Sequence, residues 1–212
     1  MRPVPPSQSQ RAFETLKERI IKGEYAAQEV LSESMIAREL GISRTPVREA
    51  LARLEAEGWV QTLPGKGVIV RAPTLRDIHE MFDLRLALER HVIFELFRSN
   101  SFVDVSALRQ ICKDQEAALT RGDAWTFFAL NGTFHRQLVA LIDNRMMLSI
   151  MDDLRDKQMQ SGYKALANRA KLSEALIEHH AIVDALERGD QDGALEAIEK
   201  HVRAAKRRLH GG

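Results

Sequence analysis

Three histidines and one asparagine have a spacing that would suit a metal site. His135 follows Asn131 by four positions, so both side chains project from one face of a helix. His179 and His201 lie in two later helical stretches. Three imidazoles and one amide oxygen from three helices could converge on one divalent cation inside a bundle. Scattered histidines are more often hydrogen-bonded residues without a ligand, so spacing alone leaves both interpretations open.

A second set of residues could bind nucleic acid. Arg44 and Arg48 lie four positions apart on one face of a predicted helix, and Lys66 lies in the tight turn Pro64–Gly67. Cations and bare backbone amides so placed can contact phosphates and groove edges. The chain has a net charge of +1, and residues 1–73 hold 11 Lys and Arg against 9 Asp and Glu. The case for DNA therefore depends on where the cations lie.

The stretch Leu31–Val70 contains the elements that would position these cations. Ser32 is a good N-cap for a first short helix, and Gly41 can end that helix in the left-handed conformation. The next helix begins within Ser43–Pro46, where the serine or the threonine can cap it and the proline costs no hydrogen bond. Strand-forming residues on both sides of Pro64–Gly67 predict a two-stranded ribbon. This order of elements indicates a winged helix-turn-helix.

The rest of the chain is predicted to be helical, because apolar residues recur at helical spacing from Thr74 onward without a strand signal. A pattern Ala-Leu-x-Arg-Gly-Asp occurs at Ala118–Asp123 and again at Ala185–Asp190, and it marks a helix end followed by an N-cap. Short connections favour an antiparallel bundle. The six predicted helices cover residues 74–98, 103–120, 123–141, a stretch from 144, 171–189 and 190 to the C-terminus, with a looser stretch near Ser161 and Gly162.

The expected fold class is therefore mainly α, with two domains. Residues 1–10 are expected to form a mobile tail, residues 11–71 the winged helix-turn-helix with a first helix over Arg11–Lys22, and residues 74–210 the helical bundle. A composition of 44% hydrophobic and 29% charged residues is that of a soluble globular protein. We expect a cytoplasmic protein without a membrane partner, because no apolar run reaches membrane-spanning length and no signal peptide is present. The single cysteine, Cys112, excludes an intrachain disulfide and a cysteine zinc cluster.

The run GISRTPVREALARLEAEGWV followed by PGKG resembles the winged helix of GntR-family transcriptional regulators. This resemblance implies a double-stranded DNA operator bound by a homodimer. Arg44 and Arg48 are expected to face the major groove, and Arg38 and Lys66 the backbone or the minor groove. The residues expected at the DNA interface are Arg38, Ser43, Arg44, Thr45, Pro46, Arg48, Gly65, Lys66 and Gly67.

The pieces LRLALE, LNGTFHRQL and EHHAIVDAL resemble the all-helical FCD ligand-binding domain of FadR-type regulators. In its metal-binding members an acidic residue and three histidines hold a divalent metal such as zinc, nickel or manganese. The resemblance assigns the histidine positions to His135, His179 and His201, with His180 as a competitor to His179. The acidic position falls on Asn131, which offers an oxygen but no charge.

Arg85 has two interpretations. By the same resemblance it occupies the position of an arginine that holds a carboxylate effector, for which a planar guanidinium is suited. The alternative is an ion pair with Glu89 at the protein surface, four positions further along the helix.

Three functions are open at this point. The leading one is a regulator whose operator affinity responds to a small organic acid, bound through a divalent metal in the helical domain. The second is a regulator of the same family with a metal-free pocket for a larger acyl ligand. The third is a metal-dependent enzyme; against it, the sequence has no HExxH motif and no recognisable nucleophile motif.

Overall fold

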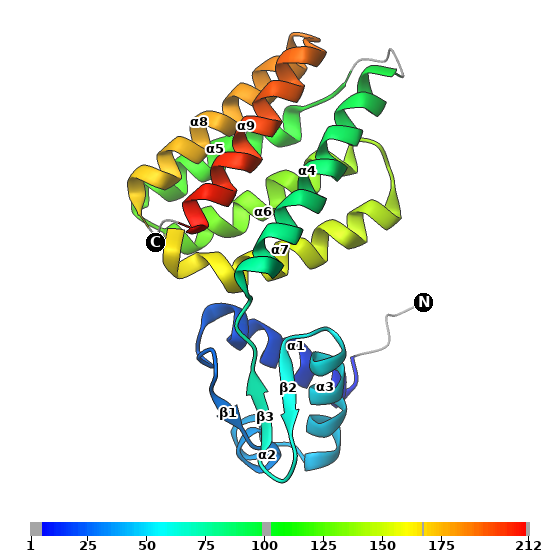
Figure 1. The fold of residues 1–212 in the computed structure, drawn as a ribbon, viewed down its shortest axis with the longest axis vertical. Helices are drawn as coiled ribbons and strands as arrows, with labels where there is room; N and C mark the ends of the chain where they lie inside the picture. The colour runs from blue at the N-terminus through cyan, green and yellow to red at the C-terminus, as the bar shows by residue number, and fades with distance from the viewer. Residues whose placement is uncertain (1–5, 99–102, 167, 211–212) are drawn as a thin grey trace. The chain divides into compact units, whose positions relative to one another are not determined.

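The structure is a computed structural model that describes residues 6–98, 103–166 and 168–210. The chain forms two compact units, residues 1–72 and residues 73–212 (Figure 1). None of the helices in the described ranges is both long enough and apolar enough to cross a lipid bilayer.

The N-terminal unit is a winged helix-turn-helix, as predicted. Its elements are α1 (Gln8–Lys22), β1 (Val30–Leu31), α2 (Glu33–Leu40), α3 (Arg44–Ala56), β2 (Val60–Leu63) and β3 (Gly67–Val70). The strands form an antiparallel sheet in the order β1-β3-β2. The predicted two-stranded ribbon is therefore incomplete, since β1 adds a third strand. A strand of two residues is too short to show an alternating pattern in the sequence, and β1 is defined only by its pairing with Ile69 and Val68 of β3.

Side-chain caps set the limits of the first two helices. The hydroxyl of Ser7 accepts a hydrogen bond from the amide of Gln10, so α1 begins at Gln8 and not at Arg11. Residues 8–10 of the expected mobile tail are thus helical, and residues 1–5 lie outside the described ranges. Ser32 caps α2 as predicted, and Gly41 ends it with a φ of 64°.

The core of this unit lies between the helices and the sheet. Its buried side chains come from α1, α2, α3 and all three strands, and they include Phe13, Leu16, Ile36, Leu54 and Trp59. Burial of this apolar surface fixes the angle between α2 and α3, which in turn fixes where their polar ends lie.

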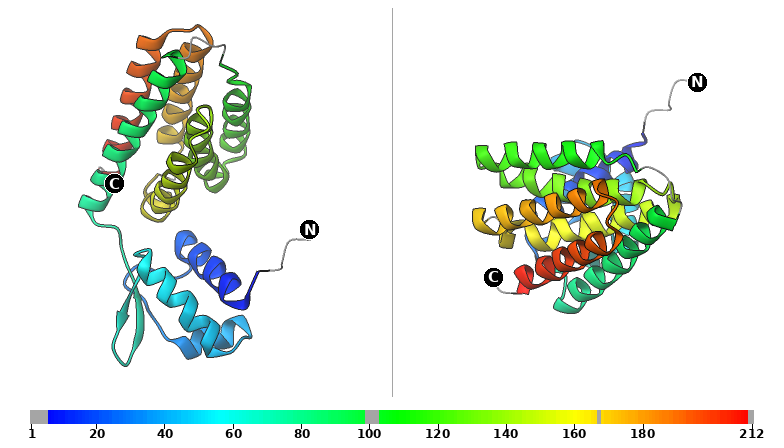
Figure 2. Two further views of the ribbon diagram at one scale, coloured as in Figure 1. Left: turned by 90° about the vertical axis from the view of Figure 1, so that its right-hand side faces the viewer. Right: turned by 90° about the horizontal axis from the view of Figure 1, so that it is seen from above.

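The C-terminal unit is a helical bundle, as predicted. Its helices are α4 (Leu75–Arg98), α5 (Ser106–Arg121), α6 (Ala124–Ala140), α7 (Arg145–Leu166), α8 (Arg169–Glu187) and α9 (Gln191–His210). Helix α9 packs against α8 and α4, while α5 packs against α6 and α8 (Figure 2). Helices α4, α6, α8 and α9 therefore all contribute to one interior.

Two helix limits in the bundle differ from the prediction. Helix α5 begins at Ser106, three residues after the predicted start. Helix α7 runs unbroken through Ser161 and Gly162, where a looser stretch was expected. A glycine costs only about 1 kcal/mol in a helix interior, and packing of the buried Met151 and Met159 on the same helix can outweigh that cost. The predicted caps at Asp123 and Asp190 are present.

Gly67 lies where the wing comes close to the backbone of β1. Its φ is +114°, and a Cβ atom there would lie 2.2 Å from the carbonyl oxygen of Leu31. Gly65, in the same turn, has a φ of +74° but no atom within 4 Å of such a Cβ. We expect Gly67→Ala to destabilise the N-terminal unit by about 2–5 kcal/mol, from backbone strain plus overlap, and Gly65→Ala by only ~1 kcal/mol.

The measurement is urea denaturation followed by the fluorescence of Trp59, which is buried in this unit, in a Trp125→Phe background. Equal destabilisation by the two alanines would show that the contact with Leu31 imposes no constraint.

Candidate DNA-binding surface and histidine centre

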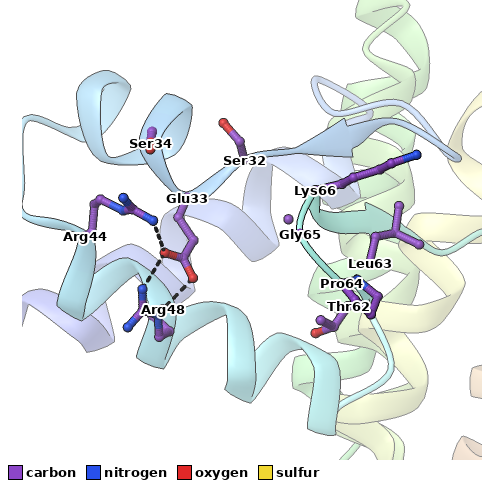
Figure 3. A pocket seen from close by; sticks show the side chains of 11 residues that line it. Ser32, Glu33, Ser34, Arg44, Arg48, Thr62, Leu63, Pro64, Gly65 and Lys66 are labelled. Carbon is purple, nitrogen blue, oxygen red and sulfur yellow. Dashed lines mark hydrogen bonds and ion pairs between the residues drawn. The ribbon is translucent and has the colours of Figure 1, made fainter.

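A hollow of about 390 Å³ lies between the start of α2, the start of α3 and the turn of the wing. Figure 3 shows Lys66 on one side of it and two arginines of α3 on the other. The lining residues are Ser32, Glu33, Ser34, Arg44, Arg48, Thr62, Leu63, Pro64, Gly65, Lys66 and Gly67. The N-terminal unit thus brings five of the nine expected DNA-contact residues to one place.

Glu33, the first residue of α2, binds both arginines of α3. Its Oε1 accepts from Nε of Arg48 and its Oε2 from Nη2 of Arg48 and of Arg44, each at 2.9 Å. These two guanidinium groups lower the pKa of the Glu33 carboxyl to about 2, so it is ionised at neutral pH. Glu33 was not among the residues expected at the DNA interface, because no local sequence pattern shows that the start of one helix contacts the face of the next.

The other expected DNA-contact residues do not line the hollow. Arg38 is exposed in the last turn of α2. Ser43 is the N-cap of α3 but makes no side-chain cap bond, and Thr45 and Pro46 follow it in the first turn. The Ser43 hydroxyl is therefore not engaged in capping the helix.

The helical unit brings the three predicted histidines together. His135 on α6, His179 on α8 and His201 on α9 are each at most 1% exposed. One ring nitrogen from each lies within 4.8 Å of the others, and Nε2 of His135 is 3.1 Å from Nε2 of His201. Three buried imidazoles at such distances have the composition and spacing of a metal ligand set.

Oxygen atoms behind two of these rings fix which nitrogen carries the proton. Nδ1 of His179 donates to Oε1 of Gln115, and Nδ1 of His201 donates to the Glu178 carboxylate, each at 2.8 Å. The Nε2 lone pairs therefore face the centre. Nε2 of His179 is buried and has no hydrogen-bond partner. Histidines that bind metals are held by outer partners of this kind, so the donor set fits a divalent metal.

Arg85 lies in the same centre and is 2% exposed. Its Nε donates to Oε1 of the fully buried Glu89 at 2.9 Å, and its Nη1 donates to Oε1 of Gln158 at 3.3 Å. Its Nη2 contacts Nε2 of His135 and lies 3.1 Å from Nε2 of His201. Oε1 of Glu89 is also 2.9 Å from Nδ1 of His135. The ion pair with Glu89, which was the alternative interpretation of Arg85, is present, but it lies in the interior and not at the surface.

Burial controls the charges in this centre. It lowers the pKa of all three imidazoles well below 6.5, and the Arg85 charge lowers each further, so the rings are neutral at neutral pH. Burial also raises the pKa of Glu89, although Arg85 opposes that shift. Oε2 of Glu89 has no hydrogen-bond partner.

Asn131 and His180 differ in their relation to the centre. Asn131 is buried one helical turn before His135, and its side chain makes no hydrogen bond to the three histidines within the described ranges. His180, the competitor to His179, is only partly buried, and its Nδ1 contacts Nη1 of Arg109 at 3.1 Å. The structure therefore places His179, not His180, in the centre.

Comparison with known proteins gives a consistent result. The family model "Bacterial regulatory proteins, gntR family" matches residues 8–70, and the FCD domain model matches residues 80–204. The gluconate operon transcriptional repressor of Bacillus licheniformis is 30% identical over 193 residues, which cover 88% of this chain and 78% of that protein. An HTH-type regulator of Agrobacterium vitis, from the TAR-I ttuE-ttuC' intergenic region, is 41% identical over 112 residues, covering 51% and 66%.

A solved GntR transcriptional regulator from Rhodococcus sp. RHA1 has the same fold. It superposes with a TM-score of 0.83 at 24% identity, covering 98% of this chain and 99% of that one.

The buried pair gives a prediction about stability. Arg85→Leu leaves the Glu89 carboxyl buried without its guanidinium and should cost the C-terminal unit about 3–5 kcal/mol, whereas the double variant Arg85→Leu/Glu89→Leu should recover most of that loss. The pair Arg76–Glu80 is a matched control, because it has the same spacing on α4 but is 86% and 62% exposed. Arg76→Leu should cost far less stability than Arg85→Leu, because exposed ion pairs contribute little.

Urea denaturation at pH 7.5 with a chelator measures these differences. A loss from Arg85→Leu no larger than that from Arg76→Leu would contradict a buried charge pair.

The neutral histidines give a prediction about pH. In the unfolded chain each titrates near 6.5, but in the folded chain its pKa is well below that value. Below about pH 6.5 the unfolded chain therefore takes up protons that the folded chain does not, and stability falls as pH falls. Each histidine should contribute up to about 1.4 kcal/mol per pH unit.

The check is the unfolding free energy between pH 6.5 and 5.5 with a chelator present. His179→Gln should reduce the slope by roughly a third, and an unchanged slope would mean that His179 does not fold in the neutral form.

Proposed function

This chain belongs to the GntR family of bacterial regulatory proteins and carries an FCD domain, and on that basis we propose that it binds an operator as a homodimer whose DNA affinity responds to a small organic acid held in the helical unit. It is a DNA-binding transcriptional regulator and not an enzyme, as its relatives are regulators. Because it acts on operator DNA, the proposal places it in the cytoplasm.

The observation that carries the effector site is the set of three inward Nε2 atoms. In the proposal, His135, His179 and His201 hold a divalent cation such as zinc, nickel or manganese, and Asn131 is a weak fourth donor. Such a cation supplies open coordination positions for a carboxylate. Neutral imidazoles and an amide leave its positive charge uncancelled, so an anionic ligand is favoured over a neutral one. The relative from Bacillus licheniformis is named for a gluconate operon, and gluconate is a hydroxy acid of this class.

Arg85 has a defined part in this proposal. The Nε2 lone pairs of His135 and His201 that face its guanidinium are those a metal ion would need. One lone pair cannot serve both, so the two cations are alternatives at these atoms. When the histidines bind a metal, Nη2 of Arg85 is free to donate to a ligand carboxylate while Nε stays on Glu89.

A second candidate keeps the regulator but gives it a metal-free pocket for a larger acyl ligand. Two observations favour it: Arg85 already faces the lone pairs, and Asn131 brings no negative charge. Metal binding distinguishes the two candidates.

At the DNA, we propose that Arg44 and Arg48 read bases in the major groove, while Arg38 and Lys66 contact the backbone or the minor groove. Backbone and small side chains of Ser43, Thr45, Pro46, Gly65 and Gly67 complete the interface. One recognition helix reads only a few base pairs, so a two-fold dimer on paired half-sites supplies the remaining specificity. An effector that favours one arrangement of the paired wings must change operator affinity, and DNA must change effector affinity equally.

The metal site is tested by a calorimetric titration, in which Zn²⁺ is added to the chelator-treated chain at pH 7.5. We expect one ion per chain, and His201→Ala should weaken binding by more than the 10–100-fold that is typical of losing an outer partner. His180→Ala, which changes a histidine outside the centre, is the control and should bind as the parent does. Asn131→Asp should tighten zinc. If the parent binds no zinc even when zinc is supplied in excess, the metal-free pocket for a larger acyl ligand replaces the metal site as the proposal.

The test of regulation uses an operator duplex selected by the parent from random DNA. Its affinity is measured with and without Zn²⁺, using gluconate as the probe acid. The four conditions combine Zn²⁺ and gluconate, each present or absent. Equal operator affinities in all four, for a chain that calorimetry has shown to bind zinc, would refute coupling by this class of acid.

A further inference from the structure

The three hydrogen bonds of Glu33 join the two helices of the helix-turn-helix through side chains alone (Figure 3). Glu33 is on α2, whereas Arg44 and Arg48 are on α3. Arg48 uses Nε and Nη2 as a two-pronged donor, and Arg44 shares the second oxygen. A planar guanidinium held at two points has its direction fixed, unlike a free arginine with several rotatable bonds.

The outer ends of the arginines remain available. Their side chains are 60% and 67% exposed, while that of Glu33 is only 22% exposed. Neither Nη1 atom is used in these bonds, and each Nη2 carries a second proton. The end of each guanidinium can therefore offer two donors to a base, such as O6 and N7 of guanine, while its inner side stays on Glu33.

We propose that Glu33 is a positioning residue that aims Arg44 and Arg48 at neighbouring bases and so determines the sequence specificity of this regulator. The Glu33 carboxylate also weakens binding to DNA that lacks the operator sequence. It faces the hollow between the recognition helix and the wing, where phosphates approach, and its charge is compensated only while both arginines stay on it. An arginine that leaves Glu33 for a phosphate exposes that charge to the DNA backbone, which weakens non-specific binding more than specific binding.

The opposite role is that Glu33 competes with DNA for the arginines and must release them before binding. The geometry favours positioning, because each guanidinium has an exposed end with protons to donate while all three bonds to Glu33 are in place. The two roles differ in sign: a positioning residue lowers specific affinity when removed, whereas a competitor raises it.

The experiment compares two duplexes, one selected by the parent from a random library and one scrambled, in the full-length chain. Glu33→Gln keeps the shape but removes the charge, and Glu33→Asp keeps the charge but shortens the reach. Glu49→Gln is the control, because it removes an equal charge from an exposed α3 residue whose side chain makes no hydrogen bond or ion pair with the described residues.

We expect both Glu33 variants to lower the ratio of specific to scrambled affinity on the order of tenfold, since a well-placed bidentate contact discriminates by about that factor. Glu33→Gln should also bind scrambled DNA more tightly than the parent. Repeating the selection with Glu33→Gln should give relaxed base preferences, a result that simple loss of stability would not produce. Glu49→Gln should keep the parental ratio and preferences.

Several results would overturn the inference. Tighter specific binding by Glu33→Gln at an unchanged ratio would identify a competitor. Equal effects of Glu33→Gln and Glu49→Gln would identify a general charge effect.

The inference rests on the proposed docking of Arg44 and Arg48, so Arg44→Ala and Arg48→Ala are measured alongside. If both alanine variants bind as the parent does, the docking fails; if they lose specificity and the Glu33 variants do not, only the positioning fails.

Discussion

A charge cannot remain in a protein interior without a partner, and the helical unit is arranged around that constraint. The guanidinium of Arg85 and the carboxylate of Glu89 are both buried, so each needs the other. The remaining donors of Arg85 are taken by Gln158, His135 and His201, which lie on α7, α6 and α9. One ion pair on α4 thereby ties four helices to a single point. The histidines are neutral because the same interior resists a second positive charge.

The N-terminal unit uses the same kind of pair for a different purpose. Glu33 binds two arginines that are mostly exposed to solvent, where ion pairs add little to stability. What such a pair supplies at a surface is direction, because it restricts the conformations of long side chains. The buried Arg85–Glu89 pair holds helices of one unit together, whereas in our proposal the exposed contacts of Glu33 orient two arginines for binding DNA.

The histidine centre is suited to an exchange of one cation for another. Its inward Nε2 lone pairs already face a positive group. A divalent ion could therefore take the place of the guanidinium without leaving a ring lone pair unpaired. In the proposal, three neutral imidazoles with Asn131 in place of a carboxylate leave the charge of a bound cation uncancelled, which favours a negatively charged ligand. Under the proposal, a bound metal would displace the Arg85 guanidinium from the histidines, and Arg85 lies on α4, which packs against α6, α7 and α9.

The sequence by itself determined the elements and the chemical types of the residues. The winged helix-turn-helix and the helical bundle follow from caps such as Ser32 and Asp123, from the stop at Gly41 and from apolar periodicity, all of which act within a few residues of the chain. The three histidines could be named only through the resemblance of the pieces that carry them to the FCD domain, because their spacing alone left both interpretations open. The prediction of a looser stretch near Ser161 and Gly162 was wrong, because α7 continues through both residues. Local helix propensity is a weak guide where tertiary packing stabilises the helix.

Tertiary structure decided everything that depends on the angle between elements. It added β1 to the sheet, brought Glu33 into contact with α3, placed the Arg85–Glu89 pair in the interior, and selected His179 over His180. A sequence pattern fixes which face of a helix a side chain is on. The identity of the partner facing it depends on how the apolar faces of several helices pack together, and that is a property of the whole core.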